Sequence, residues 1–184
     1  MSESLYRQAL GPDWDRLPQA IRQLHEVHTH HVYAGEANVE NGVTLLSRIC
    51  RVLMRFPPAA DVLPIEVILQ RDGARERWSR RFGAHPFHSI LSLPTDGERG
   101  IVIERFGMLS FRIALPVTAH GLEMPVKRAY CLGIPLPDWL MPRSQTREFV
   151  DVQGRFNFDV AVYLPLAGLI VRYRGWLQPK SELR

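Results

Sequence analysis

The sequence predicts an α+β fold that is mainly β: a strongly curved antiparallel sheet, or incomplete β-barrel, of about eight to nine strands with two N-terminal helices packed on it. Three observations predict this class. Helical periodicity is confined to the first third of the chain, a hydrophobic period of two begins near Leu63, and turn signals then recur at hairpin spacing. Short strands at this spacing are typical of antiparallel sandwiches and barrels.

The chain is expected to form one domain, residues 1–184, with a helical and first-strand segment over 5–56 and an antiparallel β meander over 63–177. Hydrophobic residues make up 46% and charged residues 23%, as in ordinary globular proteins. No apolar run approaches the roughly 18 residues of a membrane span, and the N-terminus lacks a signal-peptide layout. The two cysteines form no CxxC pair, which predicts a reduced, cytoplasmic protein. A formal charge of +4 permits an anionic partner without demanding one.

The first helix and the first strand follow one another near the N-terminus. Asp15-Arg16-Leu17-Pro18 marks a helix start, and apolar residues follow it at helical spacing as far as about His28. Residues 32–39 are expected to form a short strand, which Asn41-Gly42 ends.

A second helix is expected over residues 43–56, where Pro57-Pro58 stops it. One face of this helix is apolar and is formed by Leu45, Leu46, Ile49, Val52, Leu53 and Phe56. The other face carries Arg48, Arg51 and Arg55. These arginines could rest on anionic lipid, although such a row is more typical of a solvated face.

The meander begins with a strong hairpin signal at Arg71-Asp72-Gly73-Ala74. The expected strands, in chain order, are 65–69, 76–82, 87–93, 101–106, 109–117, 122–130, 146–152, 155–164 and 169–177.

The register of the first hairpin places a charge on an apolar face. If Asp72-Gly73 is a two-residue turn, Val67 faces Trp78 and Ile65 faces Arg80. The face that carries these apolar residues must then also carry Arg80. If the turn has three residues instead, one strand flips and the charge is exposed.

A similar two-residue turn farther along the chain places Glu104 opposite Phe111, on an otherwise apolar face. An isolated carboxylate cannot stay charged there, so Glu104 needs a hydrogen-bond donor or a raised pKa. Arg80 is the first candidate partner, and Arg172 or Arg174 are the others.

The last hairpin is predicted to form core. A four-residue turn at 165–168 places Val160 opposite Tyr173 and Asp159 opposite Arg174. One face of the hairpin is then apolar, and an Asp159–Arg174 ion pair lies on the other.

A curved sheet closed at one end by helices encloses space that side chains or a ligand can fill. The residues predicted to bind a ligand there are aromatic side chains and two charged groups: Trp78, Arg80, Phe82, Glu104, Phe111, Phe158 and Tyr173. We therefore expect a small apolar or lipid-like ligand in a cavity of the concave face, with Arg80 and Glu104 fixing its polar end. The alternative is that the aromatic residues simply form the core.

The segment LHEVHTHH (24–31) contains four of the seven histidines. The zinc motif HExxH fails here, because Thr29 stands where the second histidine is needed. His25, His28 and His30 are the candidates for a weak zinc or nickel site, but no carboxylate or cysteine is placed to complete it. A solvated helix end is the preferred interpretation, so no metal is expected.

Other chemistry has little support in the sequence. GxGxxG, GxxxxGK[ST] and GxSxG are all absent, so no cofactor is expected. RERWSRRF (75–82) mixes basic and aromatic residues as single-strand nucleic-acid binders do. Period-two burial sends Trp78 and Phe82 inward, however, so no basic and aromatic surface forms.

Several segments together carry a family resemblance: GRFNFDVAVYLPLAGLIVRYRGWL (154–177), RDGARERWSRRFG (71–83), ERFG (104–107), LGIPLPDWLMP (132–142) and LYRQALGPDWDRLP (5–18). With them the chain resembles a bacterial family catalogued only as domain of unknown function 4166. The resemblance spans nearly the whole chain and implies one intact domain. In that family the domain occurs alone or attached to saccharopine-dehydrogenase-like or short-chain reductase modules, so a separate oxidoreductase is implied as a partner. The resemblance implies no catalytic residues.

Three functions therefore compete. The first is binding of an apolar or lipid-like molecule in the concave face. The second is docking of a partner protein on an exposed apolar patch such as LGIPLPDWL (132–140). The third is catalysis with Glu104 as acid or base. We rank binding first and catalysis last.

Overall fold

The computed structural model describes residues 3–180. The helices within this range are α1 (Leu5–Leu10), the 3-10 helix η1 (Gly11–Arg16), α2 (Gln19–His25), α3 (Leu45–Leu53) and the 3-10 helix η2 (Asp138–Leu140). The strands are β1 (His30–Asn41), β2 (Ala60–Asp72), β3 (Arg75–Phe82), β4 (His85–Ser92), β5 (Ile101–Phe106), β6 (Leu109–Ala114), β7 (Val117–Thr118), β8 (Gly121–Glu123), β9 (Val126–Cys131), β10 (Ile134–Pro135), β11 (Arg143–Val150), β12 (Phe156–Leu164) and β13 (Gly168–Pro179).

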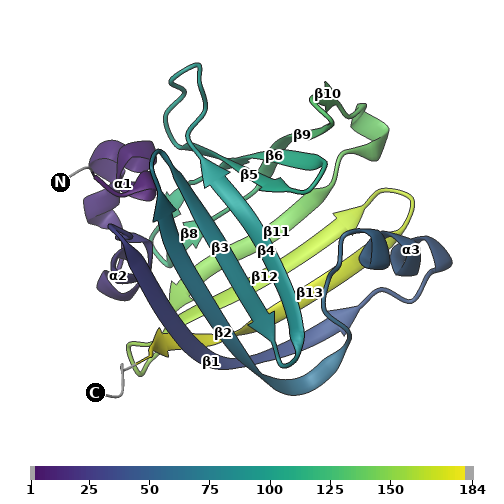
Figure 1. The fold of residues 1–184 in the computed structure, drawn as a ribbon, viewed down its shortest axis with the longest axis horizontal. Coiled ribbons are helices and arrows are strands. Elements are labelled where there is room, and N and C mark those ends of the chain that lie inside the picture. The colour runs from purple at the N-terminus through teal and green to yellow at the C-terminus, as the bar shows by residue number, and fades with distance from the viewer. Residues whose placement is uncertain (1–2, 181–184) are drawn as a thin grey trace.

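One strongly curved antiparallel sheet contains all of these strands (Figure 1). Its order is β10-β9-β6-β5-β4-β3-β2-β1-β13-β12-β11-β8-β7. The mainly β prediction is confirmed. The predicted number of eight to nine strands is wrong, because the described residues form 13 strands. Three of the additional strands, β7, β8 and β10, have only two or three residues, too few to show a hydrophobic period.

The sheet does not close into a barrel, since β10 and β7 remain as its two edges. Inside the sheet, β1 pairs with β13, so that strands from opposite ends of the chain are neighbours. Two glycines allow this pairing to be close. A Cβ atom at Gly35 would meet the carbonyl oxygen of Trp176, and one at Gly175 would meet that of Glu36.

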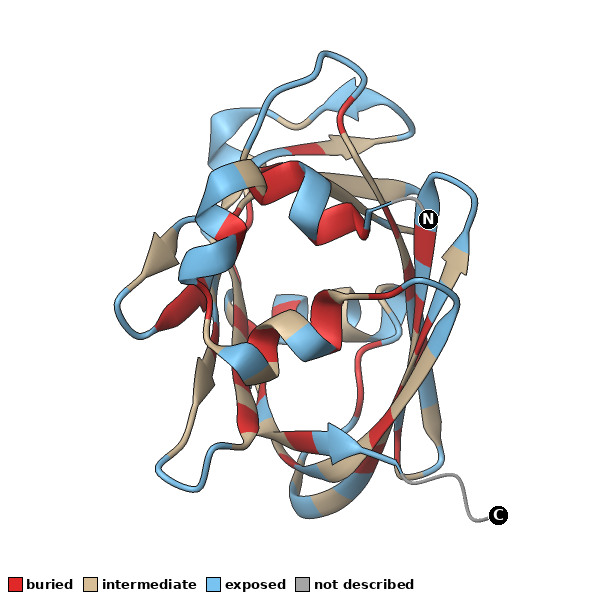
Figure 2. Cartoon of the chain, turned by 90° about the vertical axis from the view of Figure 1, so that its left-hand side faces the viewer, coloured by how far each residue is buried: buried red, intermediate tan, exposed pale blue. Residues whose placement is uncertain are grey.

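The first helices cover one end of the concave face, and their buried sides face inward (Figure 2). The most deeply buried hydrophobic residues of α1, η1 and α2 are Leu5, Tyr6, Trp14, Ile21 and Leu24. The prediction that the first helix ends near His28 is wrong. The helix α2 ends at His25, and β1 already begins at His30.

The α3 helix lies at the opposite end of the sheet, against β13 (Figure 1). The number of predicted helices is therefore too low, because α1, α2 and α3 are all present. The expectation that the second helix packs on the sheet is only partly right, because α3 contacts β13 but not through its apolar face. Ser47 is its one buried residue, and the members of the predicted apolar face that lie within α3 are turned to solvent. Phe56, which lies after the end of α3, is the one member of that face that is buried. Within residues 3–180, no helix has the length and apolar character needed to cross a membrane.

The turns decide which side chains face the concave side. The first hairpin turns at Gly73-Ala74 rather than at Asp72-Gly73, so Val67 pairs with Arg80 and not with Trp78. This shift is even, and the predicted inward face is therefore kept. The predicted pairing of Glu104 with Phe111 is confirmed.

Candidate functional site

A group of polar side chains lies on the concave face and is called the inner polar cluster here. Its members come from α1, α2, β3, β4, β5 and β11: Tyr6, His25, Glu76, Arg80, Ser89, Glu104 and Glu148. Strand β3 supplies two of them because its inward positions alternate from Glu76 through Trp78 to Arg80. Charged groups in such a place need partners, and the structure supplies them.

Arg80, Ser89 and Glu104 form a hydrogen-bonded triangle. Arg80 donates from Nη1 to Ser89 Oγ at 2.9 Å and from Nη2 to Glu104 Oε1 at 3.2 Å. Ser89 donates from Oγ to the same Glu104 oxygen at 2.7 Å. The predicted pairing of Glu104 with Arg80 is therefore confirmed. The other two candidates are excluded as partners, because Arg172 pairs with Asp159 and Arg174 pairs with Glu40.

Glu76 is fully buried and joins α1 to the sheet. Its Oε1 accepts hydrogen bonds from the backbone N–H of Leu5 at 3.2 Å and from Arg71 Nη1 at 3.3 Å. Its Oε2 accepts from Trp78 Nε1 at 3.3 Å. Three donors thus stabilise one carboxylate that has no contact with water.

His25 and Glu148 form a second buried pair, between α2 and β11. His25 Nε2 lies 2.6 Å from Glu148 Oε2, and the histidine ring stacks on Tyr6 with 3.7 Å between the ring centroids. His25 Nδ1 is buried without a hydrogen-bond partner. Burial raises the pKa of Tyr6 well above its usual value, and the negative charges of Glu148, Glu104 and Glu76 raise it further. The Tyr6 phenol therefore stays protonated.

Aromatic side chains surround the polar triangle. The Arg80 guanidinium lies over Trp78 at 4.9 Å and over Phe87 at 5.7 Å, measured to the ring centroids. Phe106 stacks on Phe87 at 5.2 Å and meets Phe111 edge-on at 5.8 Å. Phe106 and Phe111 are only half-buried.

A second aromatic group joins β3 to the opposite wall of the concave face. Phe82 on β3 meets Tyr173 on β13 with 5.2 Å between the ring centroids, although two strands separate β3 from β13. Phe158 lies 6.2 Å from Tyr173. Burial raises the pKa of Tyr173 to about 12. The contact between Phe82 and Tyr173 shows how tightly the sheet curves.

All seven residues predicted to bind a ligand lie on this face: Trp78, Arg80, Phe82, Glu104, Phe111, Phe158 and Tyr173. The sequence interpretation missed Tyr6, His25 as a buried group, Glu76, Ser89 and Glu148. The strand period could have found Glu76, since it shares the parity of Trp78 and Arg80. Ser89 could have followed from the pairing of β4, where it stands opposite Trp78.

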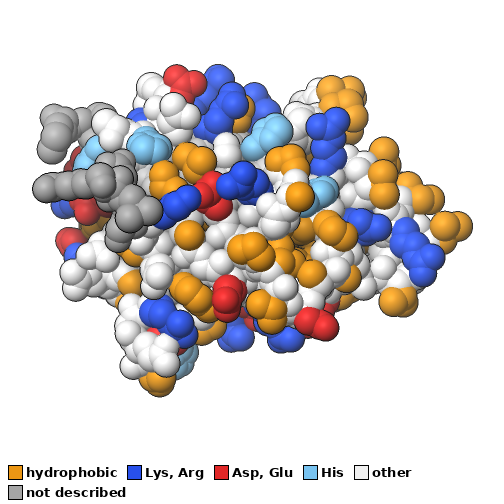
Figure 3. Space-filling model, turned by 60° about the horizontal axis from the view of Figure 1, so that its bottom comes forward, with side chains coloured by type: hydrophobic (Ala, Val, Ile, Leu, Met, Phe, Trp, Pro, Cys, Tyr) orange, Lys and Arg blue, Asp and Glu red, His pale blue; other side chains and the backbone are white. Residues whose placement is uncertain are grey.

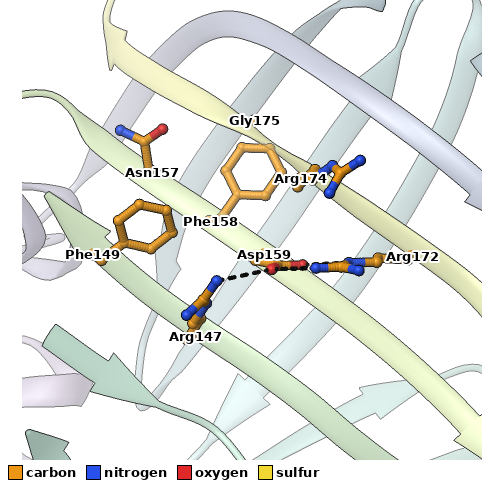
Figure 4. Close-up of a pocket in the computed structure, with 8 residues that line it drawn as sticks. All are labelled: Arg147, Phe149, Asn157, Phe158, Asp159, Arg172, Arg174 and Gly175. Atoms are coloured by element: carbon orange, nitrogen blue, oxygen red, sulfur yellow. Dashed lines mark hydrogen bonds and ion pairs between the residues drawn. The ribbon is translucent and has the colours of Figure 1, made fainter. Parts of the chain in front are cut away.

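Two hollows among the described residues lie elsewhere. One, of about 300 Å³, is on the convex side of β11, β12 and β13 (Figure 4). There Arg172 donates to Asp159 from Nε at 2.9 Å and from Nη2 at 2.8 Å, and Arg147 Nη2 donates at 3.4 Å. The predicted Asp159–Arg174 ion pair is therefore wrong, although these two residues do pair in register.

The second hollow, of about 420 Å³, is lined mainly by charged and polar side chains: Asp96, Glu98, Arg112, Lys127, Arg128 and Tyr130, together with Ile101. Neither hollow is lined by Arg80 or Glu104. Neither of these two hollows is therefore the ligand cavity that was predicted beside Arg80 and Glu104.

The histidine-rich segment is divided between the interior and the surface. His25 is buried against Glu148, whereas His28 and His30 are exposed. The interpretation as a solvated helix end is therefore wrong for His25. Among residues 3–180, no three histidine, cysteine or acidic side chains are grouped so that they could hold a metal ion.

The segment predicted to dock a partner protein lies at the β10 edge of the sheet. Leu132, Ile134 and Trp139 are exposed there. Docking of a partner at this edge stays a prediction.

One comparison identifies a related family. The family model described as "Domain of unknown function (DUF4166)" matches residues 17–177. No curated protein matches the sequence. The matched range includes nearly the whole sheet and all of the inner polar cluster except Tyr6, which lies before its start.

Proposed function

The chain belongs to the DUF4166 family, and from the geometry of its concave face we propose that it binds a small apolar or lipid-like molecule there. The observation that supports this most is the position of the Arg80–Ser89–Glu104 triangle. Its guanidinium lies over the buried rings of Trp78 and Phe87, and its carboxylate stands opposite the half-buried ring of Phe111. Ligand sites commonly combine such an apolar lining with a few fixed polar groups.

The triangle can be reached by a ligand, in contrast with the other polar groups of the cluster. The side chains of Arg80 and Glu104 are 11% and 14% exposed, whereas Glu76 is 0% exposed. Ser89 holds the carboxylate and the guanidinium in a fixed relation. A hydroxyl group at the end of the ligand would accept a hydrogen bond from Arg80 and donate one to Glu104.

The apolar part of the ligand has a surface to contact. Phe106 and Phe111 on one wall and Val160 and Val162 on the other are half-buried. The register of β12 with β13 places both valines on the inward face, in line with Tyr173. Covering these side chains would remove apolar surface from water, which favours binding of a hydrocarbon chain.

A pair of matched variants tests the proposal. Replacing both Arg80 and Glu104 by methionine removes the polar end of the site without leaving one charge unpaired. Replacing Arg174 and Glu40 by methionine removes an exposed Arg–Glu pair with an N–O distance of 2.7 Å on the convex face. We expect the Kd of a dansyl-labelled long-chain alcohol, followed by its fluorescence, to rise about tenfold or more in the first variant and to stay unchanged in the second.

Native mass spectrometry of the purified chain gives an independent measurement, since a ligand acquired during expression would appear as added mass. The absence of probe binding by the wild-type chain would overturn the proposal. Equal affinity of the probe for both methionine variants would overturn the assignment of Arg80 and Glu104.

A further inference from the structure

Six apolar side chains at α3 face solvent instead of the core. They are between 41% and 81% exposed: Val43, Leu45, Leu46, Ile49, Val52 and Leu53. We call this set the α3 apolar face. Isolated exposed apolar residues are ordinary, but a continuous stripe on one helix marks an interaction surface.

The outward direction of this face is fixed by the contacts on the other side of the helix. Thr44 caps α3 by accepting a hydrogen bond from Ser47 N at 3.1 Å, and its hydroxyl donates to the carbonyl oxygen of Ala167 at 3.0 Å. Ser47 is fully buried, and Cys50 and Met54 are half-buried on the same side. Gly42 lies so close to the backbone of β13 that a Cβ atom would meet Leu169 O. The helix therefore cannot simply roll its apolar face inward.

Unpaired positive charges flank the apolar face. Arg48 and Arg55 are exposed and Arg51 is half-buried. Within residues 3–180, none of the three forms an ion pair, and the segment 42–58 contains no acidic residue. Their charge is thus available to an anionic partner.

The surface around α3 has the same character. In Figure 3, hydrophobic and basic side chains gather at the right-hand end of the molecule, where Figure 1 places α3. Leu166, in the turn between β12 and β13, is also exposed, and it is next to Ala167, which bonds Thr44. The apolar surface therefore has neighbours outside the helix.

We propose that α3 docks the protein on the surface of a lipid bilayer that contains anionic lipid. An apolar stripe beside arginines on a short helix has the composition of helices that lie in the membrane interface. The apolar face would enter the boundary of the acyl chains, and the arginines would contact the anionic headgroups. This surface is distinct from the Arg80–Glu104 triangle, and the inference goes beyond the proposed function.

Vesicle co-sedimentation with the full chain tests this inference. We expect binding to vesicles of phosphatidylcholine mixed with phosphatidylglycerol, and much weaker binding to phosphatidylcholine alone. Replacing Ile49 and Leu53 by aspartate should reduce binding to the mixed vesicles by at least about tenfold. Replacing Arg48 and Arg51 by glutamine should reduce it by about fivefold per arginine.

The matched control replaces two exposed apolar residues away from α3, Met108 and Val152, by aspartate. This control should bind the mixed vesicles like the wild-type chain. All variants should also show the circular dichroism melting curve of the wild-type chain. Failure of the wild-type chain to bind the mixed vesicles would overturn the inference. So would unchanged binding by the Ile49 and Leu53 variant.

Light scattering distinguishes a second occupant of this surface. The wild-type chain could form a dimer that is lost in the Ile49 and Leu53 variant, and at the same time not bind vesicles. This result would assign the α3 apolar face to a second copy of the chain and overturn the lipid assignment. The dansyl-labelled alcohol should bind this variant with unchanged Kd, so that failure here is separable from failure of the proposed function.

Discussion

Replacement of Glu148 by alanine is expected to lower the free energy of unfolding by about 3 kcal/mol, because it leaves the buried His25 ring without its hydrogen-bond partner. Urea denaturation followed by tryptophan fluorescence measures this change. Glu148→Gln keeps a hydrogen-bonding group and should lose only about 1 kcal/mol.

The matched control for this prediction is Glu123→Ala, because Glu123 is an exposed glutamate on the neighbouring strand β8. It should change the free energy of unfolding by less than about 0.5 kcal/mol. A Glu148→Ala variant as stable as this control would show that the His25–Glu148 pair does not hold α2 to β11.

Replacement of Glu76 by alanine is expected to cost about 4 kcal/mol of unfolding free energy. The change leaves the Leu5 N–H and the Trp78 indole N–H buried without an acceptor, and it removes the partner of Arg71. Hydrogen exchange gives a local measurement, since the amide of Leu5 should exchange faster while amides in the centre of β13 stay protected.

The conservative variant separates charge from hydrogen bonding at this position. Glu76→Gln retains one acceptor oxygen. Its free energy of unfolding should therefore lie between that of the wild-type chain and that of Glu76→Ala. Unchanged exchange of the Leu5 amide in Glu76→Ala would contradict the view that this carboxylate fastens α1 to the sheet.

The inward face of the sheet was predictable because strand alternation survives an error in the turn. The first hairpin turns one residue later than predicted, at Gly73-Ala74, and this moves the partner of each residue by two positions. Val67 therefore meets Arg80 instead of Trp78, but all three stay on the concave side. This parity is why the Arg80–Glu104 pairing could be found before any coordinates.

The rest of the inner polar cluster has no local signal. His25 and Glu148 are 123 positions apart in the sequence, and only the docking of α2 on β11 brings them together. The prediction for His25 considered its neighbours His28 and His30, which the structure leaves on the surface. A contact between a helix and a distant strand cannot be read from the composition of either.

The direction in which α3 faces was also beyond the sequence. Its periodicity correctly predicts an amphipathic helix, and such helices usually turn the apolar side to the core. Here α3 buries Ser47 instead, and Gly42, just before the helix, lies so close to the backbone of Leu169 that no Cβ atom would fit. Closure of the sheet is equally a property of its overall geometry, not of any one strand.

The most direct test of the central claim, that the concave face binds an apolar molecule beside Arg80 and Glu104, is an isotope-filtered NOE experiment on the methyl-labelled chain with an unlabelled long-chain alcohol. We predict NOEs from the alkyl chain to the methyl groups of Val160 and Val162. NOEs confined to the methyl groups of Leu45 and Val52 on α3, or none at all, would contradict it.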